Sequence, residues 1–280
     1  MSRDGRHIFS LTQVLNGIQT LNVVQTVEPT PAGASGRRQR NRLARREQYL
    51  RAARRIVSDD GVERLTMQRM ADDLDCAVGT IYTYFDSKDA LLSELQRLAI
   101  ERIIGSYRTL VDRIEPQLAE QAADAGEAAL AQVLLGLRFW VSTAEVYPEE
   151  SNLFRALTTR RTKMSPDEAT HMLPAAWQLF ALGTTAIQAA IDTGAISPGN
   201  AGERMVTAAA AAIGGVLFLS GLSHFDPDLF AGRALALGLV DDLVRGWGAD
   251  PHRLAAASSL ADALVVEGPL VPMVAGIEAA

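Results

Sequence analysis

Residues 66–92 constrain the fold of this chain more strongly than any other stretch. Thr66 belongs to the residue types that cap helices, and the apolar residues after it recur at helical spacing: Met67, Met70, Ala71 and Leu74. After a turn at Asp75 and Cys76, residues 77–84 form a second helix of about two turns, which is too short to be stable alone. The pattern therefore predicts a helix-turn-helix unit whose second helix depends on packing.

The second helix of this unit has two chemically different faces. Ile81 and Phe85 lie one turn apart and are predicted to pack against the neighbouring helices. The other face carries side chains of a different kind: Val78, Thr80, Thr83 and Tyr84. A short helix of this size and chemistry is typical of a recognition helix that lies in the major groove of DNA.

The same stretch resembles the TetR family of bacterial transcriptional regulators. The resemblance rests on an ungapped series at residues 79–92, Gly-Thr-Ile-Tyr-Thr-Tyr-Phe-Asp-Ser-Lys-Asp-Ala-Leu-Leu, together with Thr66 and the pair Met70-Ala71. It covers residues 41–105. The remainder of the chain matches the family only in being a long, all-helical regulatory region.

Two residues depart from the family pattern. Asp75 stands in the turn where the family usually carries glycine, and Ala77 stands where a serine usually opens the recognition helix. Without the serine hydroxyl, Ala77 loses one means of capping the helix or of contacting phosphate. Ala77 is therefore expected to contribute only its shape.

The resemblance and the chemistry of groove recognition together predict the DNA-binding residues. They are Arg45, Arg46, Thr66, Gln68, Ala77, Val78, Thr80, Tyr82, Thr83, Tyr84 and Lys88. A glutamine can pair with adenine, and threonine or valine methyl groups can meet a thymine methyl. Thr66 and Lys88 lie at helix starts, which favour phosphate, and Arg45 and Arg46 are expected at the backbone or minor groove. For Tyr82, packing on the helix at residues 41–58 is an equal alternative.

Charge is distributed unevenly along the chain, whose formal net charge is −6. Residues 37–55 contain nine arginines and a single acidic residue, Glu47. Residues 37–102 have a net charge of +3, whereas residues 103–280 have a net charge of −9. A basic module joined to an acidic body is the asymmetry expected of a DNA-binding head with a separate regulatory domain.

Three segments are predicted from composition and caps. Residues 1–36 end in a Pro- and Gly-rich linker and are expected to be a mostly disordered extension, which either covers part of the regulatory domain or reflects a start codon upstream of the true one. Residues 37–86 are expected to form the helix-turn-helix domain. Residues 87–280 are expected to form the helical domain for effector binding and dimerisation.

Caps and helix breakers place the remaining helices, and no alternating strand pattern occurs, so the fold class is all-α. The expected helices cover residues 41–58, 124–146, 149–162, 175–192, 200–222, 226–245 and 250–266, besides the one that Asp86 or Ser87 caps. Pro174 is expected to force a kink or restart, which sets the start at Ala175. Asp226-Pro227 is expected to open the helix through Arg245.

The most apolar stretch, residues 208–222, is too short for a membrane span, and we expect no membrane partner. Small residues at Ala208, Ala212 and Gly215 allow close helix packing. Because the last two long helices of the family pair around a twofold axis, residues 200–247 are predicted to form a homodimer interface. The alternative is that they belong to the intramolecular core.

A small, lipophilic effector is the default ligand that the resemblance implies for the second domain. The candidate effector-binding residues are Leu135, Arg138, Phe139, Phe154, Leu157, Trp177, Phe180, Thr184 and Gln188. Apolar walls with a few polar groups are typical of ligand pockets, and Arg138 offers a partner for an anionic end. For each aromatic residue, an ordinary place in the hydrophobic core is the competing interpretation.

Several classes of protein are disfavoured by what the sequence lacks. It has one cysteine and four scattered histidines, so we expect no disulfide, metal or cofactor and place the protein in the bacterial cytoplasm. No nucleophile with an adjacent base is recognisable, so an enzyme is not expected.

The sequence thus predicts a homodimeric repressor that binds double-stranded DNA at a palindromic operator. The alternative is an effector-independent or architectural regulator controlled by a protein partner.

Overall fold

The computed structural model describes residues 34–159, 166–215, 222, 224–226, 228 and 231–264. The helices are α2 (Ala34–Asp60), the short 3-10 helix η1 (Val62–Arg64), α3 (Met67–Asp73), α4 (Val78–Tyr82), α5 (Lys88–Gln121), α6 (Ala125–Val146), α7 (Pro148–Thr159), α8 (Pro166–Asp192), α9 (Ala201–Gly214), α10 (Gly232–Gly246) and α11 (Pro251–Leu264). Every regular element in these ranges is helical, which confirms the all-α prediction. By its internal contacts the chain divides into two units, residues 1–45 and 46–280.

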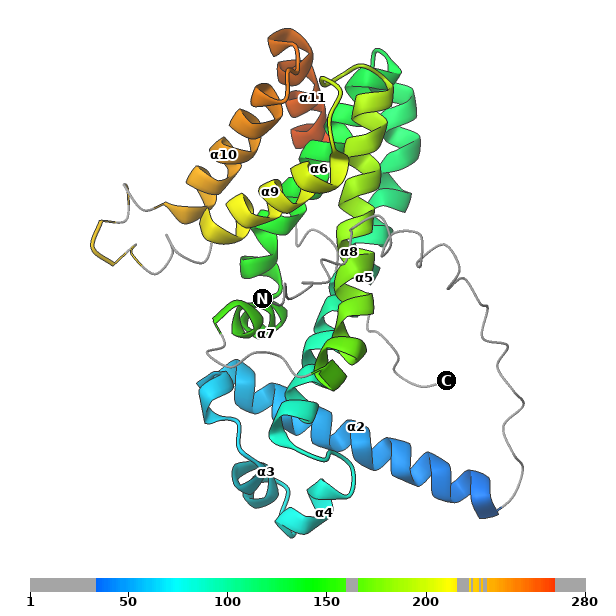
Figure 1. The fold of residues 1–280 in the computed structure, drawn as a ribbon, viewed down its shortest axis with the longest axis vertical. Coiled ribbons are helices and arrows are strands. Elements are labelled where there is room, and N and C mark those ends of the chain that lie inside the picture. The colour runs from blue at the N-terminus through cyan, green and yellow to red at the C-terminus, as the bar shows by residue number, and fades with distance from the viewer. Residues whose placement is uncertain are drawn as a thin grey trace, which may run out of the picture. The chain divides into compact units, whose positions relative to one another are not determined.

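The helix-turn-helix forms where the sequence predicts it. The Thr66 hydroxyl accepts a hydrogen bond from the Arg69 backbone N–H at 3.1 Å and caps α3. Between α3 and α4, Asp75 adopts a left-handed backbone conformation with φ of 47°. This conformation favours glycine, which explains why glycine is the usual residue of the resembled pattern at this turn. Figure 1 shows α3 and α4 next to each other, joined by this turn.

A small hydrophobic core holds these short helices together. Its side chains come from α2, from the residue after η1, from α3, and from α4 and the turn after it. They are Tyr49, Leu50, Ala53, Ile56, Val57, Leu65, Met67, Met70, Ala71, Ile81 and Phe85. Helix α5 adds Leu91, Leu92, Leu95 and Ala99, and α7 adds Leu153. We call residues 46–99 the head. Its core depends on side chains from outside the helix-turn-helix itself.

Helix α5 continues from the head into a second core. Ser87 caps it by accepting from the Ala90 N–H at 2.9 Å. Beyond Ala99, α5 buries Ile100, Ile103, Ile104, Tyr107, Leu110, Ile114 and Leu118 in a core that it shares with α6 and α8–α11. We call this second part, residues 100–264, the body. One continuous helix therefore contributes to both cores.

The body corrects one predicted helix boundary. Pro174 was expected to force a kink or restart with the helix starting at Ala175, but α8 begins at Pro166 and runs to Asp192 with this proline inside it. Pro174 is exposed, while the adjacent Met172 and Ala175 are buried against the body. Packing on both sides of the proline holds the helix together despite the missing backbone donor.

A second boundary prediction, at Asp226, is wrong. The Asp226 carboxylate accepts from the Asp228 N–H at 3.1 Å, which closes a local turn rather than capping a helix. Helix α10 begins later, at Gly232. The predicted helix 200–222 is helical to Gly214 after its Asn200 cap, but residues 216–221, the capping sequence at Ser165 and extension residues 1–33 lie outside the described residues.

Hydropathy along the helices bears on membrane association. Among the described residues, no helix combines the length and the apolar character that crossing a membrane requires.

Candidate DNA-binding and effector sites

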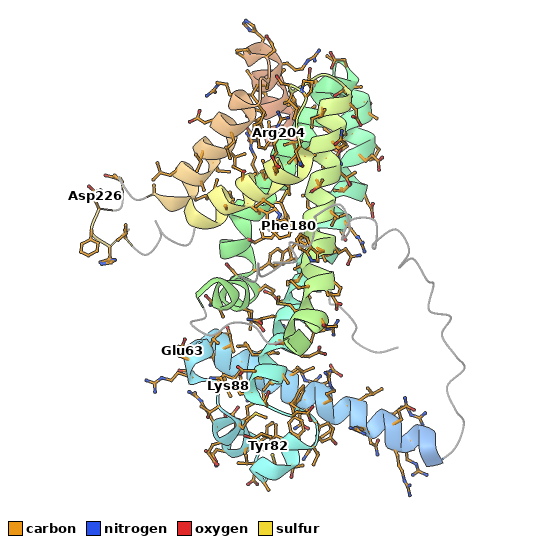
Figure 2. The ribbon with its side chains drawn as sticks, in the orientation of Figure 1. Glu63, Tyr82, Lys88, Phe180, Arg204 and Asp226 are labelled. Atoms are coloured by element: carbon orange, nitrogen blue, oxygen red, sulfur yellow. The ribbon has the colours of Figure 1, made fainter. Side chains whose placement is uncertain are left out.

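The surface of α3 and α4 brings together five of the predicted DNA-binding residues. Gln68, Ala77, Thr80, Tyr82 and Thr83 are all exposed. Tyr82 keeps 48% of its surface accessible, which agrees with a contact role better than with packing on α2. Figure 2 shows Tyr82 and Lys88 on the head, on different helices. The two helices thus offer hydroxyl, amide and aromatic groups on one small unit.

Two of these side chains already make hydrogen bonds within the protein. Gln68 Nε2 donates to Asp72 Oδ1 at 2.8 Å, and Thr83 Oγ1 donates to the Thr80 carbonyl at 2.7 Å. Both pairs are exposed, so little free energy is lost if they exchange for base edges. Asp72 orients the Gln68 amide and, because it is acidic, also repels phosphate.

Tyr84 and Val78 have a partly structural role. Both pack against the head core. The Tyr84 ring meets the buried Tyr49 ring edge-on at a centroid distance of 5.1 Å. Ala77 stands at the start of α4 without a side-chain cap. Val78 and Tyr84 therefore position α4, and only their outer atoms are available for DNA.

Two predicted phosphate contacts lie at helix N-termini. Thr66 is exposed but uses its hydroxyl oxygen to cap α3. Lys88 is the first residue of α5 and is half-buried. A cation at a helix N-terminus opposes the helix dipole, so Lys88 does not serve the stability of α5. A phosphate beside Lys88 would reverse that penalty.

The two adjacent arginines that were predicted to contact DNA differ in environment. Arg45 is exposed. Arg46 Nη1 donates to the buried Glu94 carboxylate at 2.8 Å, and its guanidinium lies 5.1 Å from the centre of the Phe85 ring. Glu94 also accepts from Arg97 Nε at 2.9 Å. Arg46 thus joins α2 to α5 inside the head.

Three further arginines of the basic segment 37–55 are paired in the same way. Arg51 pairs with Glu47, Arg54 with Glu149 and Arg55 with Asp73. The sequence shows the charge of this segment but not these pairings, and two of the acidic partners, Asp73 and Glu149, lie 18 and 95 positions from their arginines. The C-terminal part of the basic segment is therefore largely neutralised within the protein.

Helix α7 connects the head to the body through charged and polar contacts. Glu149 binds Arg54 of α2 at 2.5 Å, and Glu150 binds Arg102 of α5 at 2.6 Å. The Gln96 amide donates to the Leu153 carbonyl at 3.2 Å. Burial raises the pKa of the Glu150 carboxyl, although Arg102 opposes the shift. These contacts were not predicted from the sequence, because they join residues about 50 to 95 positions apart.

The body contains a small cavity between α5, α6, α8 and α9. Its described lining consists of Tyr107, Val133, Gly136, Leu137, Trp140, Leu179, Gly183, Ala186, Ile187 and Met205. The cavity volume is about 10 Å³, close to the smallest space that holds one water molecule. Burial raises the pKa of the Tyr107 hydroxyl to about 12, so this group is neutral.

None of the predicted effector residues belongs to the described lining of this cavity. Leu135 and Phe139 belong to the body core. Arg138 donates to Asp262 Oδ1 at 2.6 Å and to Ser258 Oγ at 2.5 Å, which ties α6 to α11. That network occupies the guanidinium that was considered for an anionic ligand.

The remaining predicted effector residues lie on α8 and α7. The Trp177 and Phe180 rings are 6.2 Å apart, and Thr184 Oγ1 donates to the Phe180 carbonyl at 2.9 Å. Gln188 is exposed and donates to Asp192. The side chains of Phe154 and Leu157 lie outside the described residues.

Two glycines make the cavity possible. A Cβ on Gly183 would overlap the Met205 sulfur, and a Cβ on Gly136 would stand 2.8 Å from the Tyr107 hydroxyl oxygen. Met205 is buried and fills the space over Gly183. Each of these glycines faces a large side chain of another helix. The sequence alone does not reveal this pairing, because it depends on how the helices are aligned.

Comparisons with known proteins agree with the helix-turn-helix geometry. Residues 50–95 match the family described as bacterial regulatory proteins, tetR family. An uncharacterized HTH-type transcriptional regulator of Haemophilus influenzae is 30% identical over 70 residues, which is 25% of this chain and 37% of the relative. The chain therefore matches little more than a third of that relative's length.

Solved structures resemble the chain over a longer range. A TetR transcription regulator from Haloarcula marismortui has a TM-score of 0.55 at 17% identity, covering 73% of this chain and 98% of the other. A regulator from Saccharomonospora viridis in complex with choline has a TM-score of 0.53 at 16% identity, covering 72% and 96%. At such identities the likeness establishes the fold alone.

The fold and the head together are those of an all-helical protein with an N-terminal helix-turn-helix. Within the head, residues 50–95 carry the pattern of the family described as bacterial regulatory proteins, tetR family.

Proposed function

We propose that this protein is a homodimeric repressor that occupies a palindromic operator and releases it when a small effector binds the body. The observation that carries the proposal is the continuity of α5. This helix begins at Lys88, in the head, and lines the cavity with Tyr107. A change at the cavity can therefore reach the head without crossing a loop.

The size of the cavity makes movement necessary for binding. A space of about 10 Å³ is far below the several hundred cubic ångströms of a typical ligand pocket. An effector must displace Met205 and separate α8 from α5 or α6. Any displacement of α5 moves Leu91 and Leu95, which are buried in the head core. Effector binding would thereby shift the population of head orientations.

The lining indicates the chemistry of the effector. All ten described lining residues are uncharged, and the neutral Tyr107 hydroxyl supplies hydrogen bonding. An uncharged, largely apolar molecule with one polar group fits this environment. The relative from Saccharomonospora viridis, which has a similar fold, holds choline, and this supports the capacity of the fold to hold a small molecule.

Exposed apolar side chains on α9 and α10 support the homodimer. Val206, Leu235 and Leu239 are between 42% and 50% exposed, and Gly238 lies on the same two-helix element without a close neighbour. Such residues favour burial against another helix. A second copy is the occupant that a palindromic operator requires, because twofold DNA symmetry mirrors that of the protein.

The second candidate is a regulator without an effector, controlled by a protein partner. The near-closed cavity is the observation that favours it. Thermal unfolding of the purified protein with a panel of uncharged apolar compounds separates the two functions. A ligand that binds only the native state must raise the unfolding temperature; no shift with any compound, together with tight operator binding, would favour the second candidate.

Selection of sheared genomic DNA tests DNA recognition itself. The purified chain is mixed with bacterial genomic fragments at about 150 mM salt, where non-specific binding is weak, and the bound DNA is sequenced. Enrichment of a single inverted repeat with half-sites about 34–36 Å apart is expected for a dimer of this class. Enrichment of one unpaired half-site would contradict the homodimer, and the absence of any shared motif would contradict sequence-specific repression.

A further inference from the structure

The first turns of α2 carry charge of a single sign. Residues 34–45 contain five arginines, Arg37, Arg38, Arg40, Arg42 and Arg45, and no acidic residue. Every side chain from residue 37 to residue 45 is exposed, and Leu43 retains 59% of its surface. We call residues 34–45 the basic arm. Its exposed apolar and cationic side chains give it no core of its own.

The rest of the same helix treats its arginines differently. Arg46, Arg51, Arg54 and Arg55 each form an ion pair with a carboxylate. Arg37, Arg38 and Arg40 have no acidic partner among the described residues. A single basic segment in the sequence is therefore two regions in the structure: one is neutralised within the head, and the other contains Arg37, Arg38 and Arg40 without an acidic partner among the described residues.

The basic arm is unfavourable for helix stability when considered alone. Arg38 and Arg42 are four residues apart, as are Arg42 and Arg46, and like charges at this spacing repel along a helix. Cations in the first turns also oppose the helix dipole. A helix of about 12 residues without a packing face is marginal in water. The arm thus has the properties of a segment that acts with an anionic partner.

We propose that the basic arm binds the phosphate backbone of DNA outside the half-site that α3 and α4 contact. DNA is the polyanion already bound by the head, and covalent attachment gives the arm a high effective concentration beside it. A helical arm of 12 residues is about 18 Å long and spans roughly five base pairs of duplex. This inference rests on the DNA-binding head alone and not on repression or an effector.

Arginine is suited to this role. The guanidinium group is always charged and binds phosphate oxygens bidentately. At about 100° per residue, the five arginines cover roughly 200° of the helix circumference, so two or three can face a backbone laid beside that side of the helix. Phosphate contacts carry no sequence information. The arm therefore adds affinity and salt dependence, and leaves the choice of operator to α3 and α4.

Salt dependence measures the proposed contacts directly. The full chain is titrated onto a labelled mixed-sequence duplex between 50 and 200 mM salt, and compared with the double variant Arg37→Gln/Arg40→Gln. Glutamine has nearly the helix propensity of arginine, so the helix is retained. Loss of two phosphate contacts lowers the slope of log K against log salt by about 1.8 per protomer, so the ratio of wild-type to variant affinity is about twelvefold larger at 50 mM than at 200 mM.

Two matched variants separate the arm from charge in general. Arg108→Gln/Arg113→Gln removes the same charge from exposed positions of α5 in the body and should leave the slope unchanged. Arg37→Lys/Arg40→Lys keeps the charge and should retain most of the slope. Equal slopes for the wild type and Arg37→Gln/Arg40→Gln would overturn this proposal alone. A wild-type chain that binds no duplex would overturn the DNA-binding function as well.

The position of the contact is tested with two duplexes that contain the inverted repeat from genomic selection. One ends at the repeat, and the other carries about ten additional base pairs on each side, twice the reach estimated for the arm. The wild type should bind the longer duplex more tightly, and Arg37→Gln/Arg40→Gln should bind both alike. If the variant loses the same affinity on both duplexes, the arm contacts the half-site itself and the proposed location is wrong.

Discussion

In the head, helices of seven and five residues, α3 and α4, are held around a few fully buried side chains. In the body, helices of 22 and 27 residues, α6 and α8, pack along most of their length. Loss of one side chain from the head therefore removes a large share of what orders the recognition helix. The body distributes the same kind of contact over many turns.

The two regions also begin their helices with different chemistry. In the head, the hydroxyl groups of Thr66 and Ser87 cap α3 and α5. In the body, the carboxylate of Asp124 caps α6 and that of Asp250 accepts from the first turn of α11. Hydroxyl caps do not titrate, whereas carboxylate caps do. The starts of α6 and α11 are thus sensitive to acid in a way that the starts of α3 and α5 are not.

The largest expected effect comes from removing a buried isoleucine in each region. Ile81 is fully buried on α4 and Ile114 is 1% exposed on α5. Either change to alanine should lower the free energy of unfolding by about 2–5 kcal/mol. Ile81→Ala should also abolish operator binding at temperatures where Ile114→Ala still binds. Urea unfolding combined with a DNA-binding assay measures both quantities.

That comparison fails if the two variants lose DNA affinity equally after correction for the folded fraction. Such a result would mean that α4 is ordered by the whole molecule rather than by the head core. Preserved DNA binding in Ile81→Ala would be equally damaging, because α4 would then not depend on its only fully buried side chain.

The next effect concerns the buried carboxylate of the head. Glu94 is 4% exposed and accepts hydrogen bonds from Arg46 and Arg97. Glu94→Gln leaves Arg46 without its counter-charge and Arg97 with Glu101 alone, and since both arginines are partly exposed the expected cost is about 1–3 kcal/mol. Glu101→Gln, which removes a more exposed partner of Arg97, should cost less than about 0.5 kcal/mol. Equal destabilisation in thermal unfolding would show that burial of Glu94 is unimportant.

Lys88→Ala should separate DNA binding from stability. Because a lysine at the start of α5 opposes the helix dipole, its removal should leave the unfolding temperature unchanged or slightly higher. Affinity for DNA should fall, and the slope of log K against log salt should decrease by about 0.9 per protomer. Fluorescence anisotropy at several salt concentrations and calorimetry provide the two readouts. A destabilised variant with normal DNA affinity would place Lys88 in the structural scaffold instead.

The smallest effect is a difference in acid sensitivity. Hydrogen bonding from the Arg253 N–H lowers the pKa of Asp250 in the folded protein. Its contribution to stability is therefore complete above the unfolded pKa of about 3.9 and is lost as the pH falls through the lower folded pKa. Asp250→Asn keeps an acceptor but does not titrate, so unfolding midpoints between pH 5 and pH 2 should vary less than in the wild type. Asp112→Asn, an exposed mid-helix change on α5, should have no such effect.

The sequence predicts best what depends on neighbouring residues. The Thr66 cap, the turn at Asp75 and the limits of α6 between Asp124 and Tyr147 are confirmed because hydrogen bonds across three or four residues decide them. The position of the recognition helix follows from the same local signals. The residues proposed to touch DNA remain predictions, although five of them lie exposed on α3 and α4.

What the sequence does not predict depends on distant partners. Pro174 continues α8 because the body packs on both sides of it. Arg46 pairs with Glu94 and Arg54 with Glu149, 48 and 95 positions away. The charged side chain of Arg138 could bind an anionic ligand, but in the structure it joins α6 to α11. In each case the side chain alone permits two roles, and tertiary neighbours select one.

The shared use of α5 has a consequence for regulators made by recombining parts. The head core includes side chains of α5 and α7, namely Leu91, Leu92, Leu95, Ala99 and Leu153. A splice immediately after the helix-turn-helix would therefore remove the side chains against which the recognition helix packs. A working chimera would have to carry the first three turns of α5 and a compatible α7 with the transplanted head. Natural recombination would face the same restriction, so the head and its adjoining helices should be inherited together as one cassette.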